Sequence, residues 1–314
     1  MLRCSLESVT YLSLARARGL NLALLVFASA CGSTGESVER SNAVVIAHRG
    51  ASGHAPEHTL EAYSIGHAMG ADLIEPDLVM CRDGYLICSH DLTVRKESNA
   101  AYLYPDLVNE AGDVMIRDLF FAELRKVNFP DAAGEGSYRY ASFVEFLDLM
   151  VLLGQRTGNK VGIIPELKAP AWHRKEGLPM ETELITRLAE AGYGALSDPV
   201  IIQCFDKESL RRLRVELQCP FPQVLCLGKG STEEDLAWAA EFCDGIAPHR
   251  AAIEDAQTGE KSGLIERAHA LGLAVFPYTF EDEEAAMRRY FYEHGVEGVF
   301  TNFPDAGVAA RAKP

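Results

Sequence analysis

The sequence has 314 residues, of which 48% are hydrophobic and 24% are charged, and its formal net charge is −15. This composition excludes a disordered or collagen-like chain, and the negative charge argues against nucleic acid as a partner. The length fits one large α/β barrel or two medium-sized domains.

Residues 1–31 have the features of an export leader. Three arginines precede an apolar run over residues 20–30, which is too short to span a bilayer as a helix. Small residues come just before Cys31, as in a bacterial lipoprotein signal. We therefore predict an exported protein, either periplasmic or anchored to the membrane by a lipid on Cys31. An organelle transit peptide or a disordered tail is the alternative, and the Gly- and Ser-rich residues 32–42 are predicted to be a flexible tether.

From residue 43 onward, short apolar runs alternate with stretches of helical spacing. Strands are predicted at 44–48, 72–80, 161–167, 200–205, 223–228, 245–249, 274–280 and 298–303. Apolar residues three and four apart predict helices, for example over 180–192, 207–217, 232–242 and 263–272. Alternating strands and helices imply a parallel sheet, and this number of strands predicts a single (β/α)8 TIM barrel over residues 43–314.

A further apolar run, at residues 85–90, is left out of this barrel. It follows the second strand across Asp-Gly at 83–84, a dipeptide typical of hairpin turns. We predict an antiparallel β-hairpin that extends the second strand beyond the barrel rim. With a two-residue turn, Asp77 would face His90 across this hairpin.

Residues 92–160 separate the second and third predicted barrel strands. They begin with a polar stretch rich in Tyr and Asn and contain a predicted helix over 143–158. A connection of this length between barrel strands is usually functional. We interpret it as an inserted, lid-like region over the barrel mouth.

Three carboxylates are unusual because they lie within apolar strands. Glu75 and Asp77 share one face of the second strand, and Glu166 lies near the end of the third. Buried acids are costly unless a cation neutralises them. Carboxylate oxygens gathered at a barrel mouth suit calcium or magnesium. The alternative is that the acids form buried salt bridges with Arg49 and Lys168.

Two histidines are predicted at the same rim. His48 ends the first strand and is followed by Arg49, and His90 ends the hairpin. A pair of histidines can supply a general base and a general acid at neutral pH. Arg49 and Lys168 can hold a phosphate. The pattern predicts a proton-transfer pair on either side of a phosphate held by a metal ion.

The ordered set of motifs resembles the glycerophosphodiester phosphodiesterase family. The motifs that follow the family's order are His-Arg-Gly at 48–50, Pro-Glu-x-Thr at 56–59, Gly-Ala-Asp-x-Ile-Glu-x-Asp at 70–77, Asp-Gly at 83–84 and His-Asp at 90–91. Further matches lie at 163–168, 201–206 and 298–305, so the resemblance covers about residues 43–305. The Pro-Glu-His-Thr-Leu variant looks most like the periplasmic or lipoprotein branch, with His58 where Asn is common.

The resemblance implies roles for the histidines and the acids. His48 and His90 would be the acid/base pair of the reaction. One divalent cation, expected to be Ca²⁺ with Mg²⁺ as the alternative, would be held by Glu75, Asp77 and Glu166.

The resemblance also implies a set of substrate-binding residues. Arg49 and Lys168 would bind the phosphate, and Glu57 would support the site from the next loop. Phe205 and Tyr278 would line the glycerol or alcohol side of the substrate. A place in the ordinary barrel core is the alternative for these two aromatic residues.

Members of this family cut a glycerophosphodiester to sn-glycerol 3-phosphate and an alcohol. The expected partner is thus a small-molecule substrate, with membrane contact only through a lipid on Cys31. The alternatives are a lysophospholipase D or sphingomyelinase D-like enzyme acting on intact lipid, or a surface lipoprotein with a binding role. The preferred alcohol, the disulfide pattern and the oligomeric state stay open at this point.

Overall fold

The computed structural model describes residues 41–255 and 257–312. The predicted leader over 1–31, its Cys31 and most of the predicted tether over 32–42 lie outside these residues. Within the described residues, no helix is both long enough and apolar enough to cross a membrane. The cysteines in this part of the chain are free thiols.

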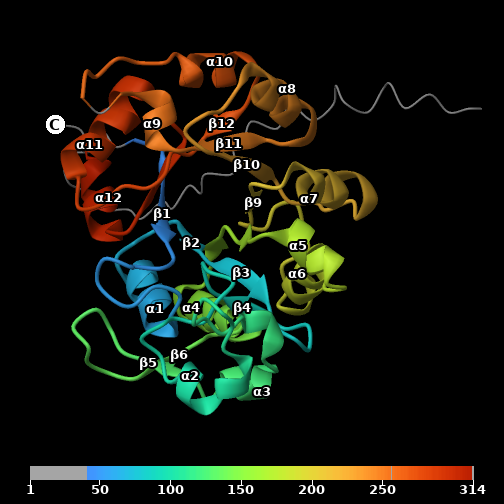
Figure 1. Ribbon diagram of the computed structural model, residues 1–314. Coiled ribbons are helices and arrows are strands. Elements are labelled where there is room, and N and C mark those ends of the chain that lie inside the picture. The colour runs from blue at the N-terminus through green and yellow to red at the C-terminus, as the bar shows by residue number, and fades with distance from the viewer. Residues whose placement is uncertain (1–40, 256, 313–314) are drawn as a thin grey trace, which may run out of the picture.

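Parallel strands form at the predicted apolar runs (Figure 1). They are β1 (Val44–His48), β2 (Leu73–Glu75), β3 (Asp77–Met80), β7 (Gly162–Ile163), β8 (Glu166–Leu167), β9 (Ile202–Cys204), β10 (Gln223–Leu227), β11 (Gly245–Pro248), β12 (Ala274–Val275) and β13 (Gly298–Thr301). They pair in the orders β13-β1-β2-β7 and β12-β11-β10-β9-β8-β3. Parallel bridges from Ile163 to Val200 and from Phe280 to Thr301 join these two sheets. The predicted TIM barrel is confirmed.

Prolines divide two of the barrel strands. Pro76 separates β2 from β3, and Pro165 lies between β7 and β8. Proline cannot donate to the hydrogen-bond ladder, so a strand that contains it is interrupted there. As a result β2 pairs with β1 and β7, whereas β3 pairs with β8. The interruptions fall beside the acids at positions 75, 77 and 166.

Helices cover the outside of the barrel. They are α1 (Leu60–Ala68), α4 (Phe143–Thr157), α5 (Pro170–Lys175), α6 (Met180–Glu190), α7 (Lys207–Arg211), α8 (Glu233–Phe242), α9 (Arg250–Ile253), α10 (Leu264–Ala270), α11 (Glu284–Arg289) and α12 (Pro304–Ala310). Two of them continue as π-helical turns, α7 over Arg212–Glu216 and α11 over Tyr290–His294. The side chain of Asp206 caps α7 by accepting a hydrogen bond from the Ser209 amide at 2.7 Å.

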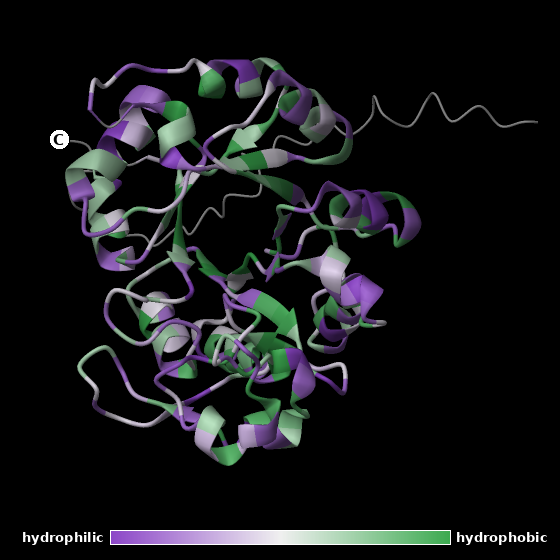
Figure 2. Cartoon of the chain, in the orientation of Figure 1, coloured by the Kyte–Doolittle hydropathy of each residue, from purple (hydrophilic) through white to green (hydrophobic). Residues whose placement is uncertain are grey.

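Apolar side chains fill the space inside the barrel and between the barrel and its helices. Ile46, Ile164, Val224, Phe276 and Phe300 are among the buried residues inside. Figure 2 shows that the strands are mostly hydrophobic, whereas the outer helices carry many hydrophilic residues. A packed barrel interior leaves the carboxyl ends of the strands as the place where polar side chains gather.

The hairpin after the second barrel strand differs from its predicted register. Strand β4 (Leu86–Cys88) pairs antiparallel with β3, with Leu78 opposite Cys88 and Met80 opposite Leu86. The loop has three residues rather than two, because Gly84 takes a left-handed φ of 86° but Asp83 does not have the positive φ that a two-residue turn of this kind needs, and Cys81 donates to the Tyr85 carbonyl. Asp77 therefore faces Ser89, whose amide donates to the Asp77 carbonyl at 3.0 Å, and not His90.

The residues after the hairpin form a small subdomain with its own core. Its elements are α2 (Ala100–Leu103), 3-10 turns at Pro105–Leu107 and Ile116–Asp118, α3 (Phe121–Leu124), β5 (Asn128–Phe129) and β6 (Tyr138–Arg139). Their apolar side chains pack on Val79, Cys81 and Ile87 of the hairpin. In Figure 1 this subdomain lies at the bottom, far from α8 to α11. The predicted insertion over 92–160 also included α4, which instead packs in the main core of the barrel.

Candidate functional site

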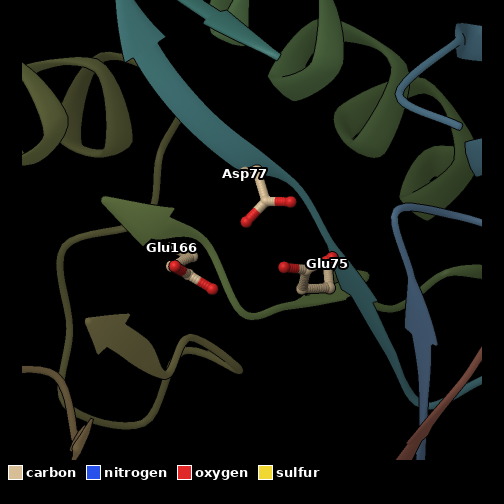
Figure 3. Close-up of side chains that lie close together, drawn as sticks. All are labelled: Glu75, Asp77 and Glu166. Carbon is tan, nitrogen blue, oxygen red and sulfur yellow. The ribbon is translucent and has the colours of Figure 1, made fainter. Parts of the chain in front are cut away.

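Three acidic side chains converge at the mouth of the barrel. One carboxylate oxygen from each of Glu75, Asp77 and Glu166 lies within 4.8 Å of the other two. Figure 3 shows the carboxylates pointing toward a common space, and they come from the end of β2, the start of β3 and the start of β8. All three are almost fully buried, with Glu166 the most exposed at 7%. The predicted convergence of acids from two separate strands is therefore present.

The strand register explains why the acids meet. Asp77 and Glu166 are direct partners in the parallel pair of β3 and β8. Glu75 ends β2 immediately before Pro76, and there it accepts hydrogen bonds from the Arg49 amide at 2.6 Å and from Gln203 Nε2 at 3.1 Å. Glu75 is thus held by a backbone amide just after β1 and by a side chain of β9, while Asp77 and Glu166 lie side by side in their strand pair.

Two cationic side chains contact the acids. Lys168 Nζ lies 2.7 Å from Glu166 Oε1 and 3.5 Å from Asp77 Oδ1. Arg49 Nε lies 3.2 Å from Asp77 Oδ2 but makes no hydrogen bond within the described residues. The salt bridges considered as an alternative do form. They leave one net negative charge when all five groups are ionised, so the ion pairs alone do not neutralise the cluster.

The pKa values of the acids reflect this shortage of positive charge. Burial and the charge of Asp77 raise the pKa of Glu166 to about 8, although Lys168 opposes the shift. Burial, Asp77 and Glu166 raise the pKa of Glu75 well above its usual range. Burial would also raise the pKa of Asp77, but the hydrogen bond from His58 and the charges of Lys168 and Arg49 lower it overall. The donor set fits a hard divalent cation, because such an ion would stabilise the ionised form of all three oxygen ligands.

His48 ends β1 directly beside Glu75, its register partner on β2. Its Nδ1 lies 2.7 Å from Asn302 Oδ1, an atom that can only accept, so Nδ1 carries the proton and Nε2 is the basic atom of the ring. Burial and the charge of Arg49 lower the pKa of His48 to about 4. The imidazole is therefore neutral at neutral pH.

Asn302 is a site residue that sequence reasoning missed. Its Oδ1 also accepts from Ser52 Oγ at 2.8 Å, and its Nδ2 donates to Glu281 Oε1 at 2.8 Å. These two contacts fix the orientation of the amide and hence the tautomer of His48. The available signal was the Thr-Asn-Phe-Pro-Asp sequence at 301–305, which matched the family motif but suggested no role.

His90 is placed differently from His48. It follows Ser89 at the end of the hairpin, and its side chain is 39% exposed. Among the described residues, the hydrogen-bond partner of its ring is the neighbouring Asp91, with Nδ1 2.8 Å from Oδ1. The structure thus places His90 one residue beyond the backbone contact with Asp77 and brings it into no direct contact with the acids.

Glu57 pairs with a different guanidinium nitrogen of Arg49 from the one that approaches Asp77. Its carboxylate accepts from Arg49 Nη1 at 2.6 Å and lies 3.2 Å from Arg95 Nη2. Arg95 belongs to the inserted subdomain and also packs over the ring of Phe129. A pocket next to this ion pair is lined by Glu57, His58, Cys88, Ser89, Asp91, Thr93, Arg95, Phe129 and Tyr140. The subdomain therefore reaches the site through Arg95.

The two predicted aromatic residues lie near Lys168 and next to each other. The ring of Phe205 is 5.7 Å from Lys168 Nζ and 6.2 Å from the ring of Tyr278. Phe205 is 48% exposed, and the Tyr278 hydroxyl donates to the Leu227 carbonyl at 3.1 Å. Phe205 is thus a surface residue at the barrel mouth and not part of the core.

Comparison with known proteins agrees with this architecture. Residues 48–306 match the glycerophosphoryl diester phosphodiesterase family. A glycerophosphodiester phosphodiesterase of Bacillus subtilis is 30% identical, covering 90% of this chain and 92% of that protein. One of Haemophilus influenzae is 28% identical, covering 86% and 90%.

A solved structure has the same fold. It is an Oleispira antarctica phosphodiesterase in complex with the product sn-glycerol-3-phosphate, with 20% identity and a TM-score of 0.64. The match covers 85% of this chain and 96% of that one. The chain belongs to the glycerophosphoryl diester phosphodiesterase family and is an enzyme of that family.

Proposed function

We propose that the protein hydrolyses glycerophosphodiesters to sn-glycerol 3-phosphate and an alcohol, with one divalent cation held by Glu75, Asp77 and Glu166. The observation that carries the proposal is the approach of these three carboxylate oxygens to within 4.8 Å at a strand end adjoining His48. The product bound to the Oleispira antarctica enzyme supports the choice of substrate. Oxygen ligands of this kind favour Ca²⁺, with Mg²⁺ as the alternative.

The charges of the site suit a phosphodiester. A divalent cation would change the net charge of the three acids, Arg49 and Lys168 from −1 to +1. A phosphodiester carries one negative charge, so its binding would neutralise the site. Arg49 offers a buried Nε–H that has no hydrogen-bond acceptor among the described residues, and Lys168 lies at the same mouth. We assign phosphate binding to these two side chains, with Glu57 holding the Arg49 guanidinium in place.

In the first step, His48 acts as the base. Its Nε2 takes the proton of the glycerol 2-hydroxyl while that oxygen forms a bond to phosphorus. The bond from phosphorus to the leaving alcohol breaks, and His90 donates a proton to the departing oxygen. The result is a cyclic glycerol phosphate and a free alcohol.

In the second step, the two histidines exchange roles. Water forms a bond to phosphorus and gives its proton to His90, while the bond to the glycerol 2-oxygen breaks and that oxygen takes a proton from His48. Both rings return to their starting protonation, and the phosphate stays on the 3-oxygen. When bound, the cation would supply Lewis-acid stabilisation of the negative charge that develops on the substrate oxygens.

The cellular location belongs to the same proposal. The leader at residues 1–31 favours export, to the periplasm or to a lipid anchor at Cys31. A periplasmic enzyme would meet deacylated phospholipids there. Separation of membrane and soluble fractions from cells that express the full chain would test this location, and a cytoplasmic protein of unchanged mass would contradict it.

The function is tested by release of glycerol 3-phosphate from glycerophosphocholine. We expect turnover that a chelator abolishes and added Ca²⁺ restores. Glu166→Gln should not respond to Ca²⁺, whereas Glu254→Gln, which changes an acid paired with Arg289 and His294 away from the cluster, should respond like the wild type. Full activity in the presence of the chelator would overturn the metal-dependent part of the proposal.

A further inference from the structure

His58 is a buried side chain whose contacts link the acid cluster to helix α1. It is 4% exposed, and its Nε2 lies 3.1 Å from Asp77 Oδ2. Its Nδ1 lies 2.9 Å from the hydroxyl of Tyr63, which is itself fully buried. The backbone of His58 has a left-handed φ of 62°, and its amide donates to the Arg49 carbonyl at 3.1 Å. The ring is therefore held at both nitrogens and at its backbone.

The two hydrogen bonds of the ring have a defined direction. An ionised Asp77 can only accept, so His58 Nε2 carries the proton and donates to Oδ2. Nδ1 is then the acceptor, and the Tyr63 hydroxyl donates to it. The Tyr63 ring packs edge-on against Phe146 of α4 at 4.7 Å, so the phenol has a fixed position in the main core.

The contacts of Asp77 differ between its two oxygens. Among the described residues, His58 is the side chain that makes a hydrogen bond to Oδ2, because Arg49 Nε approaches that atom to 3.2 Å without forming one. Oδ1 lies on the side of Lys168, whose Nζ is 3.5 Å away and also contacts Glu166. A carboxylate held at one oxygen keeps the other directed toward the centre of the cluster.

We infer that His58 is a positioning residue of the cation site, which holds Asp77 by Oδ2 so that Oδ1 is presented to the cation, and that Tyr63 holds the ring of His58 in turn. The inference rests on the proposed function, because it requires a cation between the three acids. Hydrogen-bonded partners of ligating carboxylates typically change metal affinity by about 10- to 100-fold when they are removed. Without His58 the Asp77 carboxylate would rotate about its last side-chain bond and lose this preorganisation.

Three replacements of His58 distinguish the effect of losing the hydrogen-bond donor to Asp77 from the effect of changing the left-handed backbone conformation. The amide nitrogen of Gln is as many bonds from the backbone as His Nε2, so His58→Gln can still donate to Asp77. Asn tolerates a left-handed φ well but is one bond too short, so His58→Asn keeps the backbone and loses the donor. His58→Ala loses both the donor and the contact with Tyr63.

The test is calorimetric titration of the chelator-treated protein with CaCl₂, together with thermal unfolding of each variant. We expect the Ca²⁺ dissociation constant to rise about 10- to 100-fold in His58→Ala and His58→Asn, and His58→Gln to recover most of that loss. Tyr63→Phe should weaken binding by a smaller factor. Its matched control is Tyr193→Phe, which removes another buried hydroxyl, bonded to the Val161 carbonyl at 3.0 Å, and should bind Ca²⁺ like the wild type.

The outcomes distinguish this inference from the proposed function. If the folded wild type binds no cation, the proposed metal site is wrong. If the wild type binds Ca²⁺ and folded His58→Asn binds it equally well, the metal site stands and the positioning role of His58 is wrong. Weaker binding in His58→Asn with no recovery in His58→Gln would also contradict the role, because it would show that the donor to Asp77 is not what matters.

Discussion

The two histidines at the barrel mouth differ in what holds them. His48 ends a barrel strand, and its ring is fixed by Asn302, which is fixed in turn by Ser52 and Glu281. His90 ends a hairpin and is 39% exposed, and within the part of the chain that the structure describes its ring hydrogen-bonds with the neighbouring Asp91. One histidine has a defined tautomer and a pKa lowered to about 4, whereas the other faces solvent beside a carboxylate.

In the proposed mechanism, this difference gives two parts of the fold different roles. The ends of the barrel strands supply rigid groups, namely the three acids and His48, whose ring is neutral at neutral pH as the proposed base must be. The hairpin end supplies a more exposed group, which suits the role proposed for His90 as the acid that protonates leaving alcohols of different size. This difference between the rigid strand ends and the hairpin end can be tested by mutation, and the largest effect is expected at the two histidines.

Loss of either histidine should lower turnover of glycerophosphocholine by about 10³-fold, within the usual range for acid–base catalysis. A glycerophosphodiester with a nitrophenol leaving group should separate the two roles, because nitrophenolate departs without a proton. His90→Ala should regain most of its activity on this substrate, and His48→Ala should not. Equal recovery of both variants in steady-state assays would contradict the assignment of base and acid.

Asn302→Ala should lower kcat/KM by about 10- to 100-fold, because the ring of His48 would lose the contact that sets its tautomer. Asn302→Asp should place a negative charge beside Nδ1 and raise the pKa of His48. Since the base must be neutral, activity of Asn302→Asp should begin to fall at a higher pH than in the wild type as the solution is acidified. An unchanged acidic limb of the pH–rate profile in this variant would show that Asn302 does not act through His48.

The acid cluster should make the stability of the chelator-treated protein depend on pH. The pKa of Glu166 is raised from 4.5 to about 8, so between these values the folded protein holds a proton that the unfolded chain has released. The free energy of unfolding should therefore fall as pH rises across this window, by on the order of a few kcal/mol. Denaturant unfolding at pH 5.5 and pH 8 measures the difference.

Saturating Ca²⁺ should shrink this pH dependence, because the cation stabilises the ionised acids. Glu166→Gln should shrink it without any cation. If the chelator-treated wild type is more stable at pH 8 than at pH 5.5, groups other than the acid cluster determine the pH dependence of its stability.

The smallest effect is expected at the exposed side of the mouth. Phe205→Ala should change KM by a few-fold and leave kcat nearly unchanged, because Phe205 is half-exposed and contacts Lys168 but none of the acids. Comparison of several alcohol headgroups in steady-state assays would sharpen this prediction. A loss as large as that of His48→Ala would place Phe205 in the catalytic centre.

The sequence predicted the barrel well because each barrel strand leaves a local apolar pattern in the sequence, and this pattern recurs along the chain. Each barrel strand is an apolar run, and the acids were visible as charges within two of these runs. The meeting of Asp77 with Glu166 followed from the rule that parallel strands end at one rim, and the structure confirms their proximity.

The contacts that the sequence did not reveal depend on long-range geometry. Asn302 lies 254 positions from His48, and nothing in its neighbourhood indicated that its amide would reach that ring. The hairpin register depended on whether Asp83 would adopt a left-handed conformation together with Gly84. It does not, so the loop is one residue longer than predicted and Ser89 lies opposite Asp77. From the sequence, His58 was noted only because it stands where the family commonly has Asn. The role inferred for it depends on its burial beside Tyr63 and Asp77, which the sequence does not reveal.

The most direct test of the central claim is a crystal structure of the enzyme grown with Ca²⁺ and glycerol 3-phosphate. We predict a single cation bound by one oxygen each of Glu75, Asp77 and Glu166, with the phosphate against Arg49 and Lys168 and with His48 Nε2 facing the glycerol 2-hydroxyl. A cation bound elsewhere, or a phosphate seated away from the three acids, would contradict the account.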